Sequence, residues 1–293
     1  MSVPHPIPYQ GSKRRLAQAI VAYLPGDTRK LLEPFAGSAA VSIAAAYAGK
    51  TNSFVLNDIN SPLMELWRNI INQPTLITAQ YRTLWETGLK SGIDYYNQIR
   101  SDFNRTHQPH YLLYLLTRCV KAAIRYNANG DFNQSPDNRR NGTNPNTLAQ
   151  HIYKASLLFK GNVSISAIDY QEVLEIADVA DVVYMDPPYQ GVSNNRDPRY
   201  VKGLSFDAFV ESLKKLNNKN ISYIVSYDGR TGSKVYGLRL PESLQLECME
   251  LDAGRSSQAT LLGKEHRTYE SLYLSPALTQ RLHQQLSTAK YEL

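Results

Sequence analysis

Hydrophobic and polar positions along the first sixty residues fall into alternating helical and extended patterns. Apolar residues at helical spacing predict an amphipathic helix over 12–24, and an alanine-rich run predicts a second helix over 37–48. Two short apolar runs, 29–35 and 53–57, predict β-strands on either side of the second helix. A strand, a helix and a strand at this spacing form a βαβ unit, which favours a parallel sheet.

The alternating pattern stops after residue 61. Ser61-Pro62 is expected to cap a new helix, and residues 111–124 predict another helix before a polar stretch at 127–146. Structureless loops longer than about 15 residues are rare in compact domains. We therefore expect residues 62–150 to form an inserted, mainly helical domain.

Residues 151–293 return to the α/β pattern. Apolar positions at helical spacing predict a helix over 205–216. The predicted strands are residues 163–166, 182–185, 221–226, 244–251 and 271–274. The sequence thus predicts one doubly wound α/β sheet, built by residues 1–61 and 151–293 and interrupted by the inserted domain.

The charge of the chain is unevenly distributed. The 293 residues carry 32 Lys and Arg against 26 Asp and Glu, which gives a net charge of +6 and a pI of about 9.1. Residues 100–140 hold seven basic residues and three Asp, so they contribute a net charge of +4. A basic balance fits a polyanionic partner such as nucleic acid. The local excess predicts that such a partner binds the inserted domain.

Composition also excludes several classes of protein. Two Cys residues provide neither a disulfide framework nor a four-ligand zinc site, so we expect no metal. The sequence has no apolar run of about 18 residues that would predict a membrane-spanning helix, and its first residues show no apolar signal segment. We therefore expect a cytoplasmic protein without a membrane partner.

The motif Asp186-Pro187-Pro188-Tyr189 directly follows the apolar strand predicted at 182–185. Ligands of open α/β sheets bind beyond the carboxyl ends of the strands, so this motif faces the expected cleft. The two prolines remove two backbone donors, which leaves the Pro187 carbonyl available as an acceptor beside the Asp186 carboxylate. Two acceptors suit an exocyclic amine, and Tyr189 offers a face on which a planar base can stack. A rigid turn with a solvated aspartate is the structural alternative.

Three further residues belong to the same expected cleft. Gly37, in the turn between the first strand and the next helix, permits close approach of the backbone. Asp58 follows it by 21 residues, where nucleotide-binding sheets carry an acid that binds ribose. Lys13, at the start of the first helix, either pairs with a carboxylate or phosphate or is an ordinary surface lysine.

These motifs together resemble the Dam-like DNA adenine-N6 methyltransferases, in which the cofactor motif comes first, then the target-recognition segment, then the catalytic motif. The matching segments are PYQGSK at 8–13, LLEPFAGSAAV at 31–41, NDIN at 57–60, RYNANGDFN at 125–133, VVYMDPPY at 182–189 and RSSQATLLGKEHRTYESLYLS at 255–275. The resemblance implies a Rossmann-like S-adenosylmethionine-dependent methyltransferase sheet with an inserted target-recognition domain. Such an enzyme methylates adenine N6 in double-stranded DNA after base flipping.

The resemblance also implies roles for individual residues. The catalytic motif is matched by Asp186, Pro187, Pro188 and Tyr189. The positions that match cofactor-binding ones are Tyr9, Lys13, Glu33, Pro34, Phe35, Gly37, Asp58, Ile59, Asp169 and Asp186. The residues expected to bind DNA are Arg118, Lys121, Arg125, Asn127, Asn133, Arg139 and Arg140. Arg139 and Arg140 are expected to contact phosphates. Arg125, Asn127 and Asn133 are expected to read base edges.

Two departures from the family pattern bear on these roles. Ala39 stands where the family commonly has a second glycine, so we expect this turn to avoid a positive φ. The polar segment 134–144 differs from the sequence that the family usually has there, so the DNA sequence that the protein recognises stays open. We expect a monomer, and the presence of a cognate restriction endonuclease stays open.

Three alternative functions remain at the level of sequence. A cytosine-N4 methyltransferase needs the same two acceptors, although Asp at position 186 favours adenine. A nucleic-acid-binding relative without activity would not need Lys13, Asp58 and Asp186 together. A Rossmann oxidoreductase would need a complete G-x-G-x-x-G motif, which residues 33–40 lack.

Overall fold

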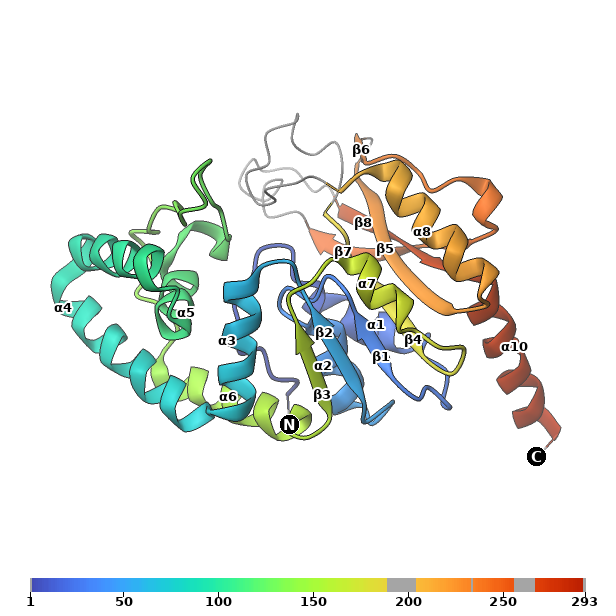
Figure 1. The fold of residues 1–293 in the computed structure, drawn as a ribbon, viewed down its shortest axis with the longest axis horizontal. Helices are drawn as coiled ribbons and strands as arrows, with labels where there is room; N and C mark the ends of the chain where they lie inside the picture. Colours follow the sequence, from blue (N-terminus) through green and yellow to red (C-terminus); the bar gives the residue numbers. More distant parts are fainter. Residues whose placement is uncertain (1, 189–203, 233, 256–266, 292–293) are drawn as a thin grey trace.

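The computed structural model describes residues 2–188, 204–232, 234–255 and 267–291, and its centre is one mixed β-sheet (Figure 1). The strands are β1 (Leu31–Glu33), β2 (Phe54–Asn57), β3 (Val163–Ser166), β4 (Val182–Met185), β5 (Ser222–Thr231), β6 (Lys234–Tyr236), β7 (Glu247–Arg255) and β8 (Arg267–Leu274). They follow the order β3-β2-β1-β4-β5-β8-β7, with β6 paired to β5. The first five strands in this order run parallel, whereas β8 runs antiparallel to both β5 and β7. The predicted doubly wound α/β fold is confirmed.

Helices cover both faces of this sheet (Figure 1). The α-helices are α1 (Ala17–Val21), α2 (Ala40–Tyr47), α3 (Ser61–Asn72), α4 (Pro74–Thr106), α5 (Pro109–Arg118), α6 (Pro145–Phe159), α7 (Tyr170–Glu175), α8 (Phe206–Asn218) and α10 (Pro276–Tyr291). Short 3₁₀ turns are η1 (Lys13–Arg15), η2 (Val120–Ala122) and η3 (Glu242–Leu244). Among the described residues, no helix combines the length and the apolar character needed to cross a membrane.

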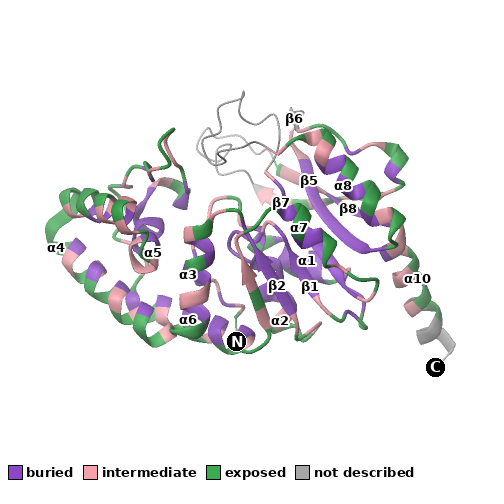
Figure 2. Cartoon of the chain, viewed as in Figure 1, coloured by how far each residue is buried: buried purple, intermediate pink, exposed green. Residues whose placement is uncertain are grey.

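Side chains of the strands alternate between two apolar cores, because successive residues of a strand point to opposite faces of the sheet. Leu31 and Tyr184 pack on one face with α1, α2, α3 and α6. Leu32 and Val183 pack on the other face with α7 and α8. Both faces are buried (Figure 2), which explains why the central strands are almost continuously apolar in the sequence.

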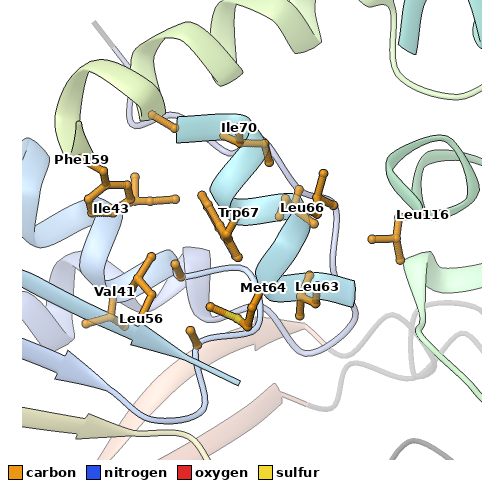
Figure 3. Close-up of a cluster of buried hydrophobic side chains, with 14 of the residues drawn as sticks. Val41, Ile43, Leu56, Leu63, Met64, Leu66, Trp67, Ile70, Leu116 and Phe159 are labelled. Carbon is orange, nitrogen blue, oxygen red and sulfur yellow. The ribbon is translucent and has the colours of Figure 1, made fainter. Parts of the chain in front are cut away.

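The inserted helices share the first of these cores. The rings of Trp67 in α3 and Phe159 in α6 have centroids 6.3 Å apart, and Phe159 lies 5.2 Å from the ring of Phe54 in β2. Figure 3 shows Trp67 and Phe159 packed beside Ile43 of α2. The helices α4 and α5 lie farther from the sheet and pack against each other (Figure 1). The division of the chain at residues 61 and 150 stays a prediction.

Two predicted helices have different ends in the structure. The helix expected over 12–24 is split at Leu16 into η1 and α1, because η1 turns the Lys13 side chain into the interior. The helix expected over 111–124 ends at 118, since the Val120 N–H donates to the Ser135 carbonyl (3.0 Å) instead of continuing the helix. The helix expected over 205–216 is confirmed by α8.

The start of α3 also differs from the prediction. Asn60, not the expected Ser61-Pro62 pair, caps this helix, and its Oδ1 accepts a hydrogen bond from the Leu63 N–H at 3.3 Å. Asparagine is among the strongest N-cap residues because its side-chain oxygen reaches a free backbone donor of the first turn. Ser61 and Pro62 instead occupy the first helical turn, where proline lacks a donor that the helix does not need.

Candidate functional site

β1 and β4 are parallel neighbours in the sheet, but the connections that follow them lead to opposite sides of it. From β1 the chain continues to β2 and β3 on one side, and from β4 it continues to β5 on the other. At such a topological switch point, open α/β sheets bind ligands beyond the carboxyl ends of their strands. A cavity of about 750 Å³ lies at this position.

All residues predicted to bind the cofactor border this cavity. They are Tyr9, Lys13, Glu33, Pro34, Phe35, Gly37, Asp58, Ile59, Asp169 and Asp186. Pro187 and Pro188 of the predicted catalytic motif border it as well, whereas Tyr189 lies outside the described residues. The structure thus brings these positions together, and their individual roles stay predictions.

The Lys13 ammonium lies between two carboxylates. Its Nζ is 2.9 Å from Asp186 Oδ1 and 3.2 Å from Glu270 Oε2. The Lys13 side chain is 6% exposed, and those of Asp186 and Glu270 are 21% and 22% exposed. Because little water screens these charges, they interact more strongly than a surface ion pair does. Lys13 is therefore not the ordinary surface lysine that the sequence left open.

Two acids of the cavity differ in protonation state. Burial raises the pKa of Asp186 to about 6, although the Lys13 charge opposes the rise. Burial raises the pKa of Glu33 to about 8, against the effect of two hydrogen bonds that Ser42 donates to its Oε2. At neutral pH, Asp186 is mostly ionised and Glu33 is mostly protonated. The first can accept hydrogen bonds from a ligand, and the second carries a proton that it can donate.

The Gly37 turn is held from three sides. The Gly37 N–H donates to Asp58 Oδ2 at 3.1 Å, and its carbonyl accepts from Trp67 Nε1 at 2.9 Å. A Cβ at this glycine would lie 3.1 Å from Cε1 of Tyr9, and its φ is +49°. The other Asp58 oxygen accepts from the Asn60 N–H at 3.0 Å. Burial raises the pKa of Asp58, and these two backbone donors oppose the rise.

Ala39 contradicts the expectation that its turn avoids a positive φ. Its φ and ψ are 48° and 36°, in the left-handed region, and it is fully buried at the start of α2. The Ala39 N–H donates to the Ala36 carbonyl at 2.6 Å, which closes the turn. A residue with a Cβ pays roughly 1–2 kcal/mol for this conformation. The loop thus keeps a left-handed turn without the glycine, because the surrounding packing holds it.

Asn57 is a site residue that the sequence analysis missed. It is fully buried at the end of β2, and its Nδ2 donates to the carbonyls of Pro34 (3.1 Å) and Ile168 (3.0 Å). Its Oδ1 accepts from Ser166 Oγ (2.7 Å) and from the Ile168 N–H (3.0 Å). Asn57 therefore joins the loops that follow β1, β2 and β3. A polar residue that ends an apolar strand was the signal, since buried polar groups need partners.

The inserted segment supplies part of the cavity wall. His107, Tyr126 and Gly130 border the cavity. The Tyr126 hydroxyl donates to Asn60 Oδ1 at 3.2 Å, and the Asn60 N–H donates in turn to Asp58. A chain of hydrogen bonds thus connects the segment expected to bind DNA with the acid at the end of β2.

Arg118 does not lie on the exposed surface expected for a DNA-binding residue. It is 5% exposed, and its guanidinium carbon is 5.9 Å from the ring centre of Tyr114. Its Nε and Nη1 are buried and have no hydrogen-bond partner among the described residues. The last two turns of α5 are buried on all sides, which the sequence pattern did not reveal.

The other residues expected to bind DNA are more accessible. Lys121, Arg125, Asn133, Arg139 and Arg140 are exposed. Arg139 and Arg140 form ion pairs with Asp137, at 3.2 and 3.3 Å. The side chain of Asn127 shapes its own loop, since its Oδ1 accepts from the N–H groups of Asn129 and Asp131. Base reading by Asn127 stays a prediction, and its amide already has these partners.

The cavity combines acidic groups with exposed apolar surface. Asp186 and Asp58 border it together with Ile59, which is 62% exposed, and Ile168. This lining suits a ligand that carries positive charge and a planar ring. Within the described ranges, no group of three or more His, Cys, Asp or Glu side chains is arranged to hold a metal ion.

A family model described as D12 class N6 adenine-specific DNA methyltransferase matches residues 9–247. The Retron Ec67 DNA adenine methylase of Escherichia coli is 33% identical to this chain over 189 residues, which cover 62% of each protein. The DNA N-6-adenine-methyltransferase of Escherichia phage P1 is 27% identical over 233 residues, which cover 78% of this chain and 28% of that protein. The Type II methyltransferase M.MjaIII of Methanocaldococcus jannaschii is 27% identical over 207 residues, which cover 65% of this chain and 70% of that protein.

The chain thus spans less than two thirds of the length of the first two relatives. The solved structure of an rRNA methylase from Streptococcus thermophilus covers 90% of this chain at a TM-score of 0.36 and 8% identity, which is too distant to bear on function. The range matched by the family model includes every residue predicted to bind the cofactor and ends before Glu270.

We expect Gly37→Ala to weaken the binding of S-adenosylmethionine, the cofactor implied by the sequence, about tenfold. The reason is that the new Cβ would lie 3.1 Å from the Tyr9 ring at the cavity wall. Gly49→Ala is the matched control, because Gly49 also has a positive φ (+65°) but no described atom within 4 Å of the added Cβ. Both variants should lose roughly 1 kcal/mol of unfolding free energy in urea denaturation. Equal calorimetric affinities in the two variants would contradict a role of the Gly37 turn in cofactor binding.

Proposed function

This chain belongs to the D12 class N6 adenine-specific DNA methyltransferase family, and from that membership we propose that it transfers a methyl group from S-adenosylmethionine to adenine N6 in double-stranded DNA. The observation that carries the proposal is the position of Asp186. It lies at the carboxyl end of β4, beside Pro187 and Pro188, in the cavity that the Gly37 turn also borders. Acceptors for an exocyclic amine and a cofactor-sized cavity therefore meet at one place.

The chemistry of the cavity fits S-adenosylmethionine. The cofactor carries a sulfonium and an ammonium group, and the carboxylates of Asp186 and Asp58 supply negative charge around the cavity. The exposed side chain of Ile59 offers an apolar surface for a planar ring. The residues that would hold the cofactor are Tyr9, Lys13, Glu33, Pro34, Phe35, Gly37, Asp58, Ile59, Asp169 and Asp186.

When bound, S-adenosylmethionine supplies the methyl group and a good leaving group. The task of the protein is to prepare the adenine amine, which is a poor nucleophile because its lone pair is delocalised into the ring. Asp186 and the Pro187 carbonyl accept hydrogen bonds from the two N6 hydrogens, which favours a pyramidal nitrogen and offsets the positive charge that develops on it. In the transfer, the bond from the methyl carbon to the sulfonium sulfur would break as the carbon joins N6, S-adenosylhomocysteine would leave, and one N6 proton would pass to Asp186 or to water.

The ionisation of Asp186 links this reaction to pH. Its pKa of about 6 lies above the usual aspartate value, so the carboxylate is present above pH 6 and is lost as the pH falls through that value. The protonated carboxyl offers one acceptor fewer to the amine. Methyl transfer should accordingly decline on the acid side of about pH 6.

The target adenine has to leave the base stack, because duplex geometry hides N6 from the cofactor. We propose that Tyr189 stacks on the extruded base and replaces part of the lost stacking energy. The basic segment 100–140 supports contacts to the DNA backbone. We further propose that the enzyme is a monomer of the cytoplasm.

Plasmid DNA incubated with the protein and S-adenosylmethionine should contain N6-methyladenine when its nucleosides are analysed by mass spectrometry. Asp186→Ala should abolish this product while DNA binding remains measurable, because the variant loses one acceptor for the target amine but keeps the exposed basic side chains that would contact the DNA backbone. More than about a tenth of the wild-type activity in this variant would contradict the role of Asp186.

Two other outcomes would support the alternative functions. N4-methylcytosine in the treated DNA would identify a cytosine-N4 enzyme. Failure of calorimetry to detect cofactor binding would indicate an inactive DNA-binding relative.

The double variant Lys121→Ala/Arg125→Ala should reduce the salt dependence of DNA affinity by about two units of log–log slope, because both side chains are exposed and neither forms an ion pair in the described part of the chain. Lys214→Ala/Lys215→Ala on α8 is the control, with the same change in net charge. Fluorescence anisotropy over a range of salt concentrations gives both slopes. An unchanged slope in the first variant would place the DNA elsewhere on the surface.

A further inference from the structure

Glu270 has no task in the proposed reaction, although it belongs to the charged group around Asp186. It lies in β8, outside the range 9–247 that the family model matches. Its Oε2 contacts the same Lys13 ammonium that contacts Asp186, and all three side chains are largely buried. A surface ion pair that contributes little would be solvated on all sides, which is not the case here.

We propose that Glu270 is a positioning residue for methyl transfer: it shares the Lys13 ammonium with Asp186, and so prevents this cation from fully neutralising the Asp186 carboxylate. The inference rests on the proposed function, since Asp186 needs acceptor capacity only if an amine binds there. Glu270 acts through Lys13, because its Oε2 lies 3.2 Å from the Lys13 Nζ.

Glu270 lies opposite a β-bulge in the neighbouring strand β5. The pairing of β5 with β8 changes register between Ser226 and Gly229, and Glu270 pairs with Gly229 directly after the change. Asp228 in this bulge has a φ of +56°, and its Oδ2 accepts a hydrogen bond from the Tyr273 hydroxyl at 2.7 Å. Bulges beside active sites commonly direct a side chain. Glu270 therefore lies at the point where the register of this strand pair changes.

Among the described residues, the charged and titratable groups that interact with Asp186 include Lys13 of η1, Glu33 of β1, Tyr184 of β4 and Glu270 of β8. Burial raises the pKa of Glu33 to about 8 and raises the pKa of Tyr184, so both are mostly neutral at pH 7. One cation then faces two carboxylates, and the group carries a net charge of −1. This surplus negative charge faces the amine on which positive charge develops.

Removal of the Glu270 charge should have two consequences for Asp186. Lys13 would pair with Asp186 alone, which makes the carboxylate a weaker acceptor and slows methyl transfer. The pKa of Asp186 would fall, because the negative charge of Glu270 contributes to its rise. A merely structural ion pair would change stability or KM and would leave the pH dependence of kcat unchanged.

The experiment compares Glu270→Gln with the wild-type protein in methyl transfer to plasmid DNA from about pH 5 to 9. We expect kcat to fall about tenfold and its acid limb to move roughly one pH unit lower, with KM for S-adenosylmethionine changed less than about twofold. Glu250→Gln is the matched control. It removes a glutamate of the adjacent strand β7 that pairs with Arg230 at 2.7 Å, away from Asp186, and should leave kcat and its pH profile unchanged.

The inference is overturned if the acid limb of the kcat–pH profile does not move in Glu270→Gln. It is also overturned if this limb moves by the same amount in Glu250→Gln. If Glu270→Gln does not fold, Glu270→Asp takes its place, because it keeps the charge but shortens the reach to Lys13. Its acid limb should move in the same direction by a smaller amount, and an unmoved limb again overturns the inference. A wild-type protein without methyl transfer refutes the proposed function itself, whereas an active wild type with an unmoved limb refutes only the role of Glu270.

Discussion

The arrangement of the site depends on one ammonium group that lies between two partly buried carboxylates. Lys13 contacts Asp186 at the end of β4 and Glu270 in β8, although β5 separates these strands in the sheet. Charges in such surroundings are costly unless they are paired, so each of the three groups restricts the position of the other two. The tight turn η1 directs Lys13 inward, and Glu270 lies opposite the bulge of β5.

The loops around the cavity are supported from below by buried polar side chains. Asn57 joins the ends of three strands, Asp58 accepts from the Gly37 N–H, and Trp67 donates to the Gly37 carbonyl. Each of these contacts satisfies a buried polar group and restricts the loop at the same time. Because Trp67 belongs to α3 and Tyr126 contacts Asn60, the inserted segment takes part in shaping the cavity. A displacement of α3 or of Tyr126 would therefore alter the loops that border the cavity.

Much of the fold and of the cavity lining follows from the sequence, for physical reasons. The parallel strands are buried on both faces, so they read as continuous apolar runs, and their order with helices restricts the topology. The carboxyl ends of parallel strands meet at one edge, which is why Gly37, Asp58 and Asp186 could be assigned to one cleft. Their placement around a single cavity agrees with this prediction.

The remaining features depend on contacts between distant segments or on backbone conformation. Glu270 is far from Lys13 in the sequence, and no local pattern indicates that the fold brings them together. In the sequence, Arg118 resembles a basic surface residue, yet the packing of α5 buries it. Ala39 adopts a left-handed conformation that alanine disfavours, so the residue type alone predicts the opposite. Tertiary packing determines the outcome in each case.

In the proposed reaction, Asp186 and the Pro187 carbonyl receive the amine of an extruded adenine beside the Lys13 ammonium. A crystal structure of the protein with a non-reactive S-adenosylmethionine analogue and its double-stranded DNA substrate tests this most directly. We expect an adenine outside the base stack, with N6 within about 3.2 Å of both acceptors and with Lys13 still between Asp186 and Glu270. An adenine that remains stacked, a cytosine in the cavity, or an N6 bound away from Asp186 would contradict it.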